Sequence, residues 1–175
     1  MAGLGTIGVA DALKDFLAAR FPDFYVYRTY LGYDSADETN AENVGKRARI
    51  AVVPESFSFD PASRGRLARQ VVCRVVVLKN FDASTVDETT FAPAVECDPL
   101  VGTLEAIAEL FTERVVVAKR TGENGSDAEA VLYVPETRFS TDSPLYDEES
   151  LTRGTFLGAL RVAVYEKIAR REETR

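Results

Sequence analysis

The sequence contains no histidine and no tryptophan, one methionine and two cysteines. Without histidine, Ser-His-Asp and Cys-His catalysis, an imidazole general base and most zinc sites are excluded. The two cysteines, Cys73 and Cys97, cannot build a disulfide framework, which suits a reducing compartment. We therefore predict that the chain is not an enzyme and that it uses no metal and no other cofactor.

Basic residues are scarce as well. The chain has 21 Lys and Arg against 28 Asp and Glu, a net charge of -7 at pH 7. Binding to nucleic acid through phosphate neutralisation needs clustered basic side chains, so specific binding of this kind is not expected. No apolar run approaches the ~18 residues of a membrane-spanning helix. The first six residues lack the basic start of a secretory signal. We expect neither membrane insertion nor export.

The 175 residues, 46% of them hydrophobic and 28% charged, fit one globular domain spanning 1–175. Apolar residues at helical spacing predict a helix over 6–20, with Thr6 as its N-cap. Its buried face is expected to contain Ile7, Ala10, Leu13 and Leu17, with Phe16 beside them. A second helix is predicted to start with Asp98 as cap and Pro99 at the first helical position. Its apolar stripe contains Leu100, Leu104, Ile107, Ala108 and Phe111.

Runs of β-branched and aromatic residues predict strands over 24–31, 49–53, 70–78, 115–118 and 130–139. Pro54 is expected to end the second of these. The third run is almost continuously apolar, which favours a central strand covered by helix, and Cys73 within it is expected to be buried. The order of elements predicts an α/β (α+β) fold: a mixed, mainly antiparallel sheet packed by two helices, with long loops and a long C-terminal strand.

That last strand is predicted over 153–168, because apolar and polar residues alternate along it. One face contains Phe156, Leu160, Val162 and Val164, and the other contains Arg161, Tyr165 and Lys167. Fully extended, it would span roughly 50 Å at about 3.3 Å per residue, whereas a domain of this size is only about 40 Å across. The strand must therefore bend, for example at Gly158, or project to where another chain covers its edge.

The only basic cluster apart from the C-terminal arginines contains Arg64, Arg66 and Arg69. It has two interpretations: ordinary surface charge, or an anchor for carboxylates on a neighbouring subunit, which the arginine fork suits. We predict an oligomer or partner interface that includes these three arginines together with Arg161 and Tyr165.

Acidic residues cluster in long predicted loops, over 34–46, 80–97 and 140–152. Loops of this length are uncommon in compact domains unless they are functional or disordered. Solvated loop charge is one interpretation, and a carboxylate pair that acts on a substrate is another. The acidic candidates are Asp34, Asp37, Glu38, Asp147, Glu148 and Glu149.

Four segments, ADALKDFLAARFPDFYVY, QVVCRVVVL, DPLVGTLEAIAELF and GTFLGALRVAVYEK, resemble the tail terminator (tail completion) proteins of long-tailed bacterial and archaeal viruses. The resemblance covers about half of the chain. It implies a virion protein of the tail or neck, assembled in the host cytoplasm as a hexameric ring on the last ring of tail-tube protein. Such a ring stops tube growth and presents a surface to the head-tail connector, and DNA passes through its lumen without specific binding. The six acidic candidates would then face that channel.

Other interpretations stay open. The chain would also fit another neck, tail-tube or baseplate subunit, or a head-completion protein. From other functional classes, a small enzyme that uses carboxylates or lysine and a cellular binding module are the alternatives.

Overall fold

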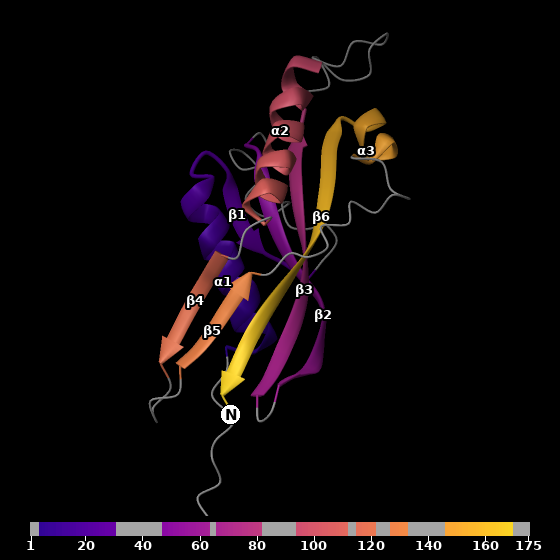
Figure 1. Ribbon diagram of the computed structural model, residues 1–175. Helices are drawn as coiled ribbons and strands as arrows, with labels where there is room; N and C mark the ends of the chain where they lie inside the picture. Colours follow the sequence, from indigo (N-terminus) through magenta and orange to yellow (C-terminus); the bar gives the residue numbers. More distant parts are fainter. Residues whose placement is uncertain are drawn as a thin grey trace, which may run out of the picture.

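The structure is a computed structural model that describes residues 4–30, 47–63, 66–81, 94–111, 115–121, 127–132 and 146–169. The elements in these ranges are α1 (Gly5–Arg20), β1 (Tyr25–Arg28), β2 (Arg49–Ser63), β3 (Arg66–Asn80), α2 (Ala94–Leu110), β4 (Val115–Thr121), β5 (Asp127–Leu132), α3 (Glu148–Thr152) and β6 (Thr155–Ala169). Figure 1 shows their arrangement. No helix in the described ranges is both long and apolar enough to cross a membrane.

The described strands form one sheet in the order β1-β2-β3-β6-β5-β4. β1 runs parallel to β2, and every other neighbouring pair is antiparallel. The predicted α+β fold, with its mainly antiparallel mixed sheet and its long C-terminal strand, is confirmed. The run predicted as a central strand lies in β3, between β2 and β6, and Cys73 within it is buried.

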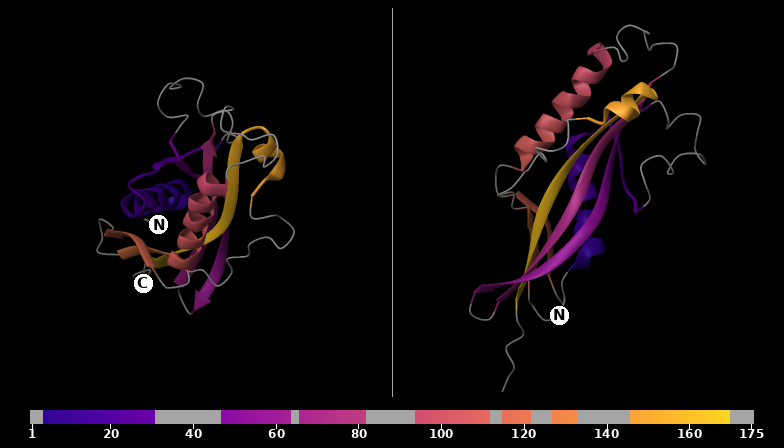
Figure 2. Two further views of the ribbon diagram at one scale, coloured as in Figure 1. Left: turned by 90° about the horizontal axis from the view of Figure 1, so that it is seen from above. Right: turned by 90° about the vertical axis from the view of Figure 1, so that its right-hand side faces the viewer.

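Three strands of 15 residues each, β2, β3 and β6, make up most of the sheet. β6 pairs with β3 along its entire length, from Thr155 opposite Asn80 to Ala169 opposite Arg66. The three strands curve together, as the right-hand view of Figure 2 shows. The long C-terminal strand therefore bends, and it does so with its neighbours rather than at one glycine.

The short strands are staggered along the long ones. β1 pairs only with residues 49–52 of β2, whereas β5 pairs only with residues 164–167 of β6. The part of the sheet beyond β1 therefore has the order β2-β3-β6-β5-β4. We call this part the hairpin half. It contains residues 54–63 of β2, 66–73 of β3 and 162–169 of β6, together with β5 and β4, and its β2–β3 end projects away from α2 (Figures 1 and 2).

One face of the sheet, here called the covered face, packs against α1 and α2. The main core contains Val9, Ala10, Leu13, Leu17, Ile50, Val52, Val71, Cys73, Val75, Val77, Phe81, Leu100, Leu104, Ile107, Phe111, Phe156, Leu160, Val162 and Val164. The four alternating residues predicted for the inner face of β6 are all among them. A smaller cluster of Ala51, Val76 and Leu78, with Tyr27 and Leu157 packed against it, lies on the opposite face.

The start of α1 differs from the sequence prediction. The helix begins at Gly5, where φ is 72°, and its N-cap is Leu4, without a side-chain hydrogen bond. Thr6 is therefore not the cap. Ile7, predicted to be buried, is 54% exposed, and Val9 is buried in the core instead. The reason is a tertiary contact, because the backbone N–H of Leu4 donates to the buried carboxylate of Glu166 on β6.

The prediction that Pro54 ends its strand is wrong. β2 continues to Ser63, with a β-bulge between Pro54 and Ser56. The carbonyl of Val52 accepts a hydrogen bond from the N–H of Thr29, just beyond β1. Backbone groups alternate sides along a strand, so the nitrogen of Pro54 also faces outward, where β3 loses no hydrogen bond.

The second helix also starts earlier than predicted. α2 begins at Ala94 and contains Pro99, so Asp98 is not its cap. The additional turn is fixed to the sheet by an ion pair of 3.0 Å between Lys79 Nζ and Glu96 Oε2. Pro99 is the sixth residue of α2, so it lies past the first turn, and the helix forgoes the hydrogen bond that an N–H at this position would donate to the carbonyl of Val95.

Smaller differences concern two other segments. Cys97 lies within α2 rather than before it. The predicted loop 140–152 contains the short helix α3. The predicted loop 34–46 and residues 133–139 of the fifth predicted strand lie outside the described residues, as does most of the loop predicted over 80–97.

Candidate assembly surface

An exposed aromatic pair lies on the hairpin half of β2. Phe57 and Phe59 are 58% and 48% exposed, their rings meet edge to face, and the ring centroids are 5.9 Å apart. In the register of β2 and β3, Phe57 lies opposite Val71 and Phe59 opposite Arg69. Val71 belongs to the main core, so both aromatic residues lie on the covered face, in the part of it that extends past the core.

Arg69 connects this aromatic pair to the interior. Its guanidinium carbon lies 5.1 Å from the centroid of the Phe59 ring. Its Nη1 donates to Glu166 Oε2 at 3.3 Å, and Glu166 is fully buried. The other carboxylate oxygen of Glu166 accepts the backbone N–H of Leu4. The network therefore holds the start of α1, β3 and β6 together beneath the aromatic pair.

The predicted arginine cluster is only partly described. Arg69 has its carboxylate partner within the chain and is 18% exposed. Arg64 lies outside the described residues, and for Arg66 only the backbone in β3 is described, opposite Ala169. Within the described chain, Arg69 thus acts as the partner of a buried carboxylate.

The opposite face of the hairpin half is polar. Gln70 Nε2 donates to the hydroxyl of Tyr165 at 2.8 Å, and the hydroxyl of Ser58 donates to Gln70 Oε1 at 3.2 Å. The three residues lie directly across three neighbouring strands. Of the predicted interface residues, Tyr165 is therefore tied to its own sheet.

Arg161, also predicted as an interface residue, belongs to an ion-pair network on the same face. Arg74 and Arg161 lie opposite each other on β3 and β6, an arrangement that is unfavourable for like charges. Glu55, the additional residue of the bulge, bridges them: Oε2 lies 3.0 Å from Arg161 Nε, and Oε1 pairs with Arg74. Arg161 remains 63% exposed.

The acidic candidates of the sequence divide into two groups. Asp34, Asp37 and Glu38 lie outside the described residues. Asp147 is the N-cap of α3 and accepts from the Glu149 N–H at 3.3 Å and from the Ser150 hydroxyl. The hydrogen bond from Ser150, more than any other contact, lowers the pKa of Asp147 below its usual value.

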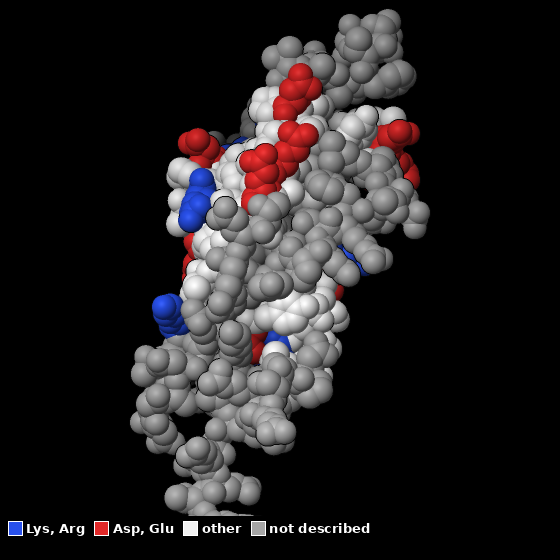
Figure 3. Space-filling view, viewed as in Figure 1, with Lys and Arg blue, Asp and Glu red and all other residues white. Residues whose placement is uncertain are grey.

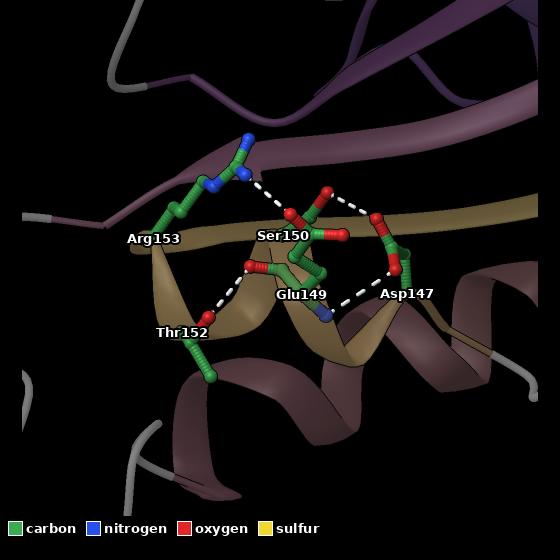
Figure 4. A network of polar contacts seen from close by, with 5 residues as sticks. All are labelled: Asp147, Glu149, Ser150, Thr152 and Arg153. Carbon is green, nitrogen blue, oxygen red and sulfur yellow. Dashed lines mark hydrogen bonds and ion pairs between the residues drawn. The ribbon is translucent and has the colours of Figure 1, made fainter.

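Figure 4 shows the rest of this network, in which the carboxylate of Glu149 pairs with Arg153 and the hydroxyl of Thr152 donates to the Glu149 carbonyl at 2.7 Å. Glu148 follows the cap in the first turn, where the helix dipole favours negative charge. All three acidic residues, Asp147, Glu148 and Glu149, are thus explained as parts of a helix start.

A second acidic surface was not singled out from the sequence. Asp98, Glu105 and Glu109 are exposed on α2, and spacings of seven and four residues place them on one side of the helix. Figure 3 shows acidic side chains along α2 and over α3. The signal was present in the sequence, since these positions lie between the apolar positions of the same helix.

The aromatic pair was missed as well. The alternation in Ser56-Phe57-Ser58-Phe59 is typical of a strand with one apolar face, but the prediction that Pro54 ends the strand placed it in a connection. Alternation on both sides of the proline was the signal that could have found it.

The sequence matches no protein-family model and no curated protein.

Proposed function

We propose that the protein is a virion structural protein that forms a ring at the end of a viral tail tube, ends tube assembly and joins the tail to the head connector. Six copies are expected from the resemblance to tail terminators. The partners are further copies of the chain, the tail-tube protein and the connector, and DNA passes through the ring without specific binding.

The observation that carries this proposal is the aromatic pair on the projecting hairpin half. Single exposed hydrophobic residues are ordinary, but Phe57 and Phe59 are neighbours, each about half exposed, with Arg69 stacked on one ring. Aromatic residues and arginine are the side chains enriched at the centres of protein interfaces. A surface of this kind favours permanent contact with another subunit over a life as a monomer.

The acidic side chains on one side of α2 support the part of the proposal in which DNA passes through the ring. A lumen that lets a polyanion slide must repel it weakly rather than neutralise its phosphates. Asp98, Glu105 and Glu109 provide such a surface on one side of a helix, and the chain as a whole has a net charge of -7.

The first test is the native mass of the purified protein, measured for the wild type and for Phe57→Ser/Phe59→Ser. We expect a ring-sized assembly for the wild type and a folded monomer for the variant. Tyr25→Ser/Tyr30→Ser is the matched control, because it removes two aromatic residues that are 47% and 59% exposed outside the hairpin half. A wild-type protein that is monomeric at high concentration would contradict the proposal.

The second test addresses the place of the ring in the virion. The protein is added to tail-tube protein of the same virus during polymerisation, and tube lengths and the position of the labelled protein are measured by electron microscopy. Terminator function predicts a label at one tube end and no further growth there. A label along the tube or at the opposite end would identify another tail component instead. Turnover of a small molecule by the isolated chain would favour an enzyme.

A further inference from the structure

We propose that neighbouring copies join by extending each other's sheets: the outer edge of β2 in the hairpin half pairs, in parallel, with β4 of the next copy. This inference rests on the proposed ring and specifies the contact that would close it.

The hairpin half has two different open edges. In the described chain, β2 pairs with β1 only through Val52, and β4 is the last strand on the other side of the sheet. Figure 1 shows these edges on opposite sides of the hairpin half. An open edge is a template for another strand. Because the two edges differ, pairing them is a head-to-tail contact, which gives a closed ring when the rotation between copies closes.

The available edge of β2 is short and well defined. The carbonyl of Val52 faces β1, and Val52 lies opposite Val75, so the even-numbered residues of β3, Gln70 among them, turn their backbone groups toward β2. Ser58 lies opposite Gln70 and bonds to β3, so the backbone groups of Phe57 and Phe59 face outward. Pro54 and Pro61 occupy the outward positions before and after them and offer no N–H. The prolines therefore limit an added strand to the segment of Phe57 and Phe59, which protects the rest of the edge from nonspecific pairing.

The register of the sheet also indicates which residues meet. One row of directly opposite residues runs Ser58, Gln70, Tyr165, Val131, Val116, and another runs Asp60, Ala68, Lys167, Glu129, Lys119. Each neighbouring pair in these rows is antiparallel, so β4 has the same direction as β2. A next copy that continues both rows places Val116 beside Ser58 and Lys119 beside Asp60.

The positions for a cross-link follow from these rows. Ser58 is exposed and Val116 is 38% exposed. Neighbouring strands lie about 4.8 Å apart, within reach of a disulfide. The test variant is Ser58→Cys/Val116→Cys in a Cys97→Ser background; Cys73 is fully buried and stays. On mild oxidation we expect a ladder of covalent oligomers that ends at the ring.

Three controls make the result decisive. Ser58→Cys alone and Val116→Cys alone should give no ladder, and neither should Ser58→Cys paired with Ala18→Cys, an exposed position on α1. Phe57→Pro removes one outward N–H without affecting the bonds to β3. Relative to Phe57→Ala, it should raise the concentration needed for half-assembly by about fivefold, as expected for one lost hydrogen bond.

The outcomes separate this inference from the proposed function. An intact ring by native mass without cross-linking of the double variant would overturn the edge contact and leave the ring. Efficient dimers from Ser58→Cys alone would replace it by a two-fold contact between β2 strands. A monomer under all conditions would remove both proposals.

Discussion

Glu166 is a fully buried carboxylate, and its side chain fixes how the first helix meets the sheet. It accepts from the Leu4 N–H and from Arg69. A buried charge is tolerated only when it is paired and hydrogen-bonded. The same contacts explain why α1 starts without a side-chain cap, since the orphan N–H at its N-terminus is satisfied by a residue 162 positions away.

Glu166→Gln should therefore destabilise the chain, because it leaves the guanidinium of Arg69 largely buried without its counter-charge. We expect a loss of about 2–4 kcal/mol of unfolding free energy, measured by urea denaturation. Arg69→Met combined with Glu166→Gln should cost less than the sum of the single variants. Glu149→Gln, which removes the exposed pair with Arg153, is the control and should change stability by less than about 0.5 kcal/mol. Equal effects at positions 149 and 166 would show that the buried network contributes nothing.

The two cysteines should differ sharply in reactivity. Burial raises the pKa of the Cys73 thiol to about 12, with a further contribution from Glu55. Burial also raises the pKa of Cys97, together with Asp98 and Glu96, but that residue is only partly buried. Only the thiolate reacts. A raised pKa therefore slows labelling of the thiol at any pH below that pKa, and the labelling rate increases as the pH approaches the pKa. A thiol reagent should label one cysteine in the folded protein, faster with rising pH, and both in denaturant. Rapid labelling of Cys73 in the folded chain would contradict its burial.

At the scale of elements, the sequence was informative where one element determines its own pattern. The continuous apolar run of β3 and the alternation in β6 predicted both strands and their inner residues. The predictions failed where the structure of one element depends on a neighbouring element. Whether Pro54 ends a strand depends on which side its nitrogen faces, and that is set by β1 and β3. The sequence prediction missed the exposed aromatic pair for the same reason, because Phe57 and Phe59 follow that proline.

The two faces of β6 allow a direct test. Leu160 lies in the main core and is 2% exposed, whereas the adjacent Ala159 is exposed on the opposite face. Leu160→Asp should cost several kcal/mol and abolish folding or assembly, because it buries an unpaired charge. Ala159→Asp is the matched control and should leave the melting temperature nearly unchanged. A folded Leu160→Asp variant together with an unfolded Ala159→Asp variant would reverse the assignment of the faces.

At the scale of the whole molecule, the two ends of the staggered sheet differ in the residues that lie on their faces. Beside β1, the long strands carry the smaller apolar cluster on one face and core residues on the other. In the hairpin half, the covered face ends in exposed aromatic residues, and among the described residues no strand pairs with β2 beyond Val52 or with the outer edge of β4. Monomeric proteins usually protect their sheet edges with charges, prolines or covering segments, so the exposed Phe57 and Phe59 at this edge support the proposed contact between copies.

This division predicts where assembly changes backbone protection. Amides that are bonded within the sheet, such as that of Val75 in β3, should exchange slowly both in the ring and in wild-type protein diluted until it is monomeric. The outward amide of Phe59 should exchange roughly tenfold more slowly in the ring, because only there does it find a partner. Hydrogen exchange followed by mass spectrometry or NMR measures both in one experiment. Equal exchange of Phe59 in the two states would mean that copies meet through side chains alone, since a backbone contact cannot form without protecting the amide that makes it.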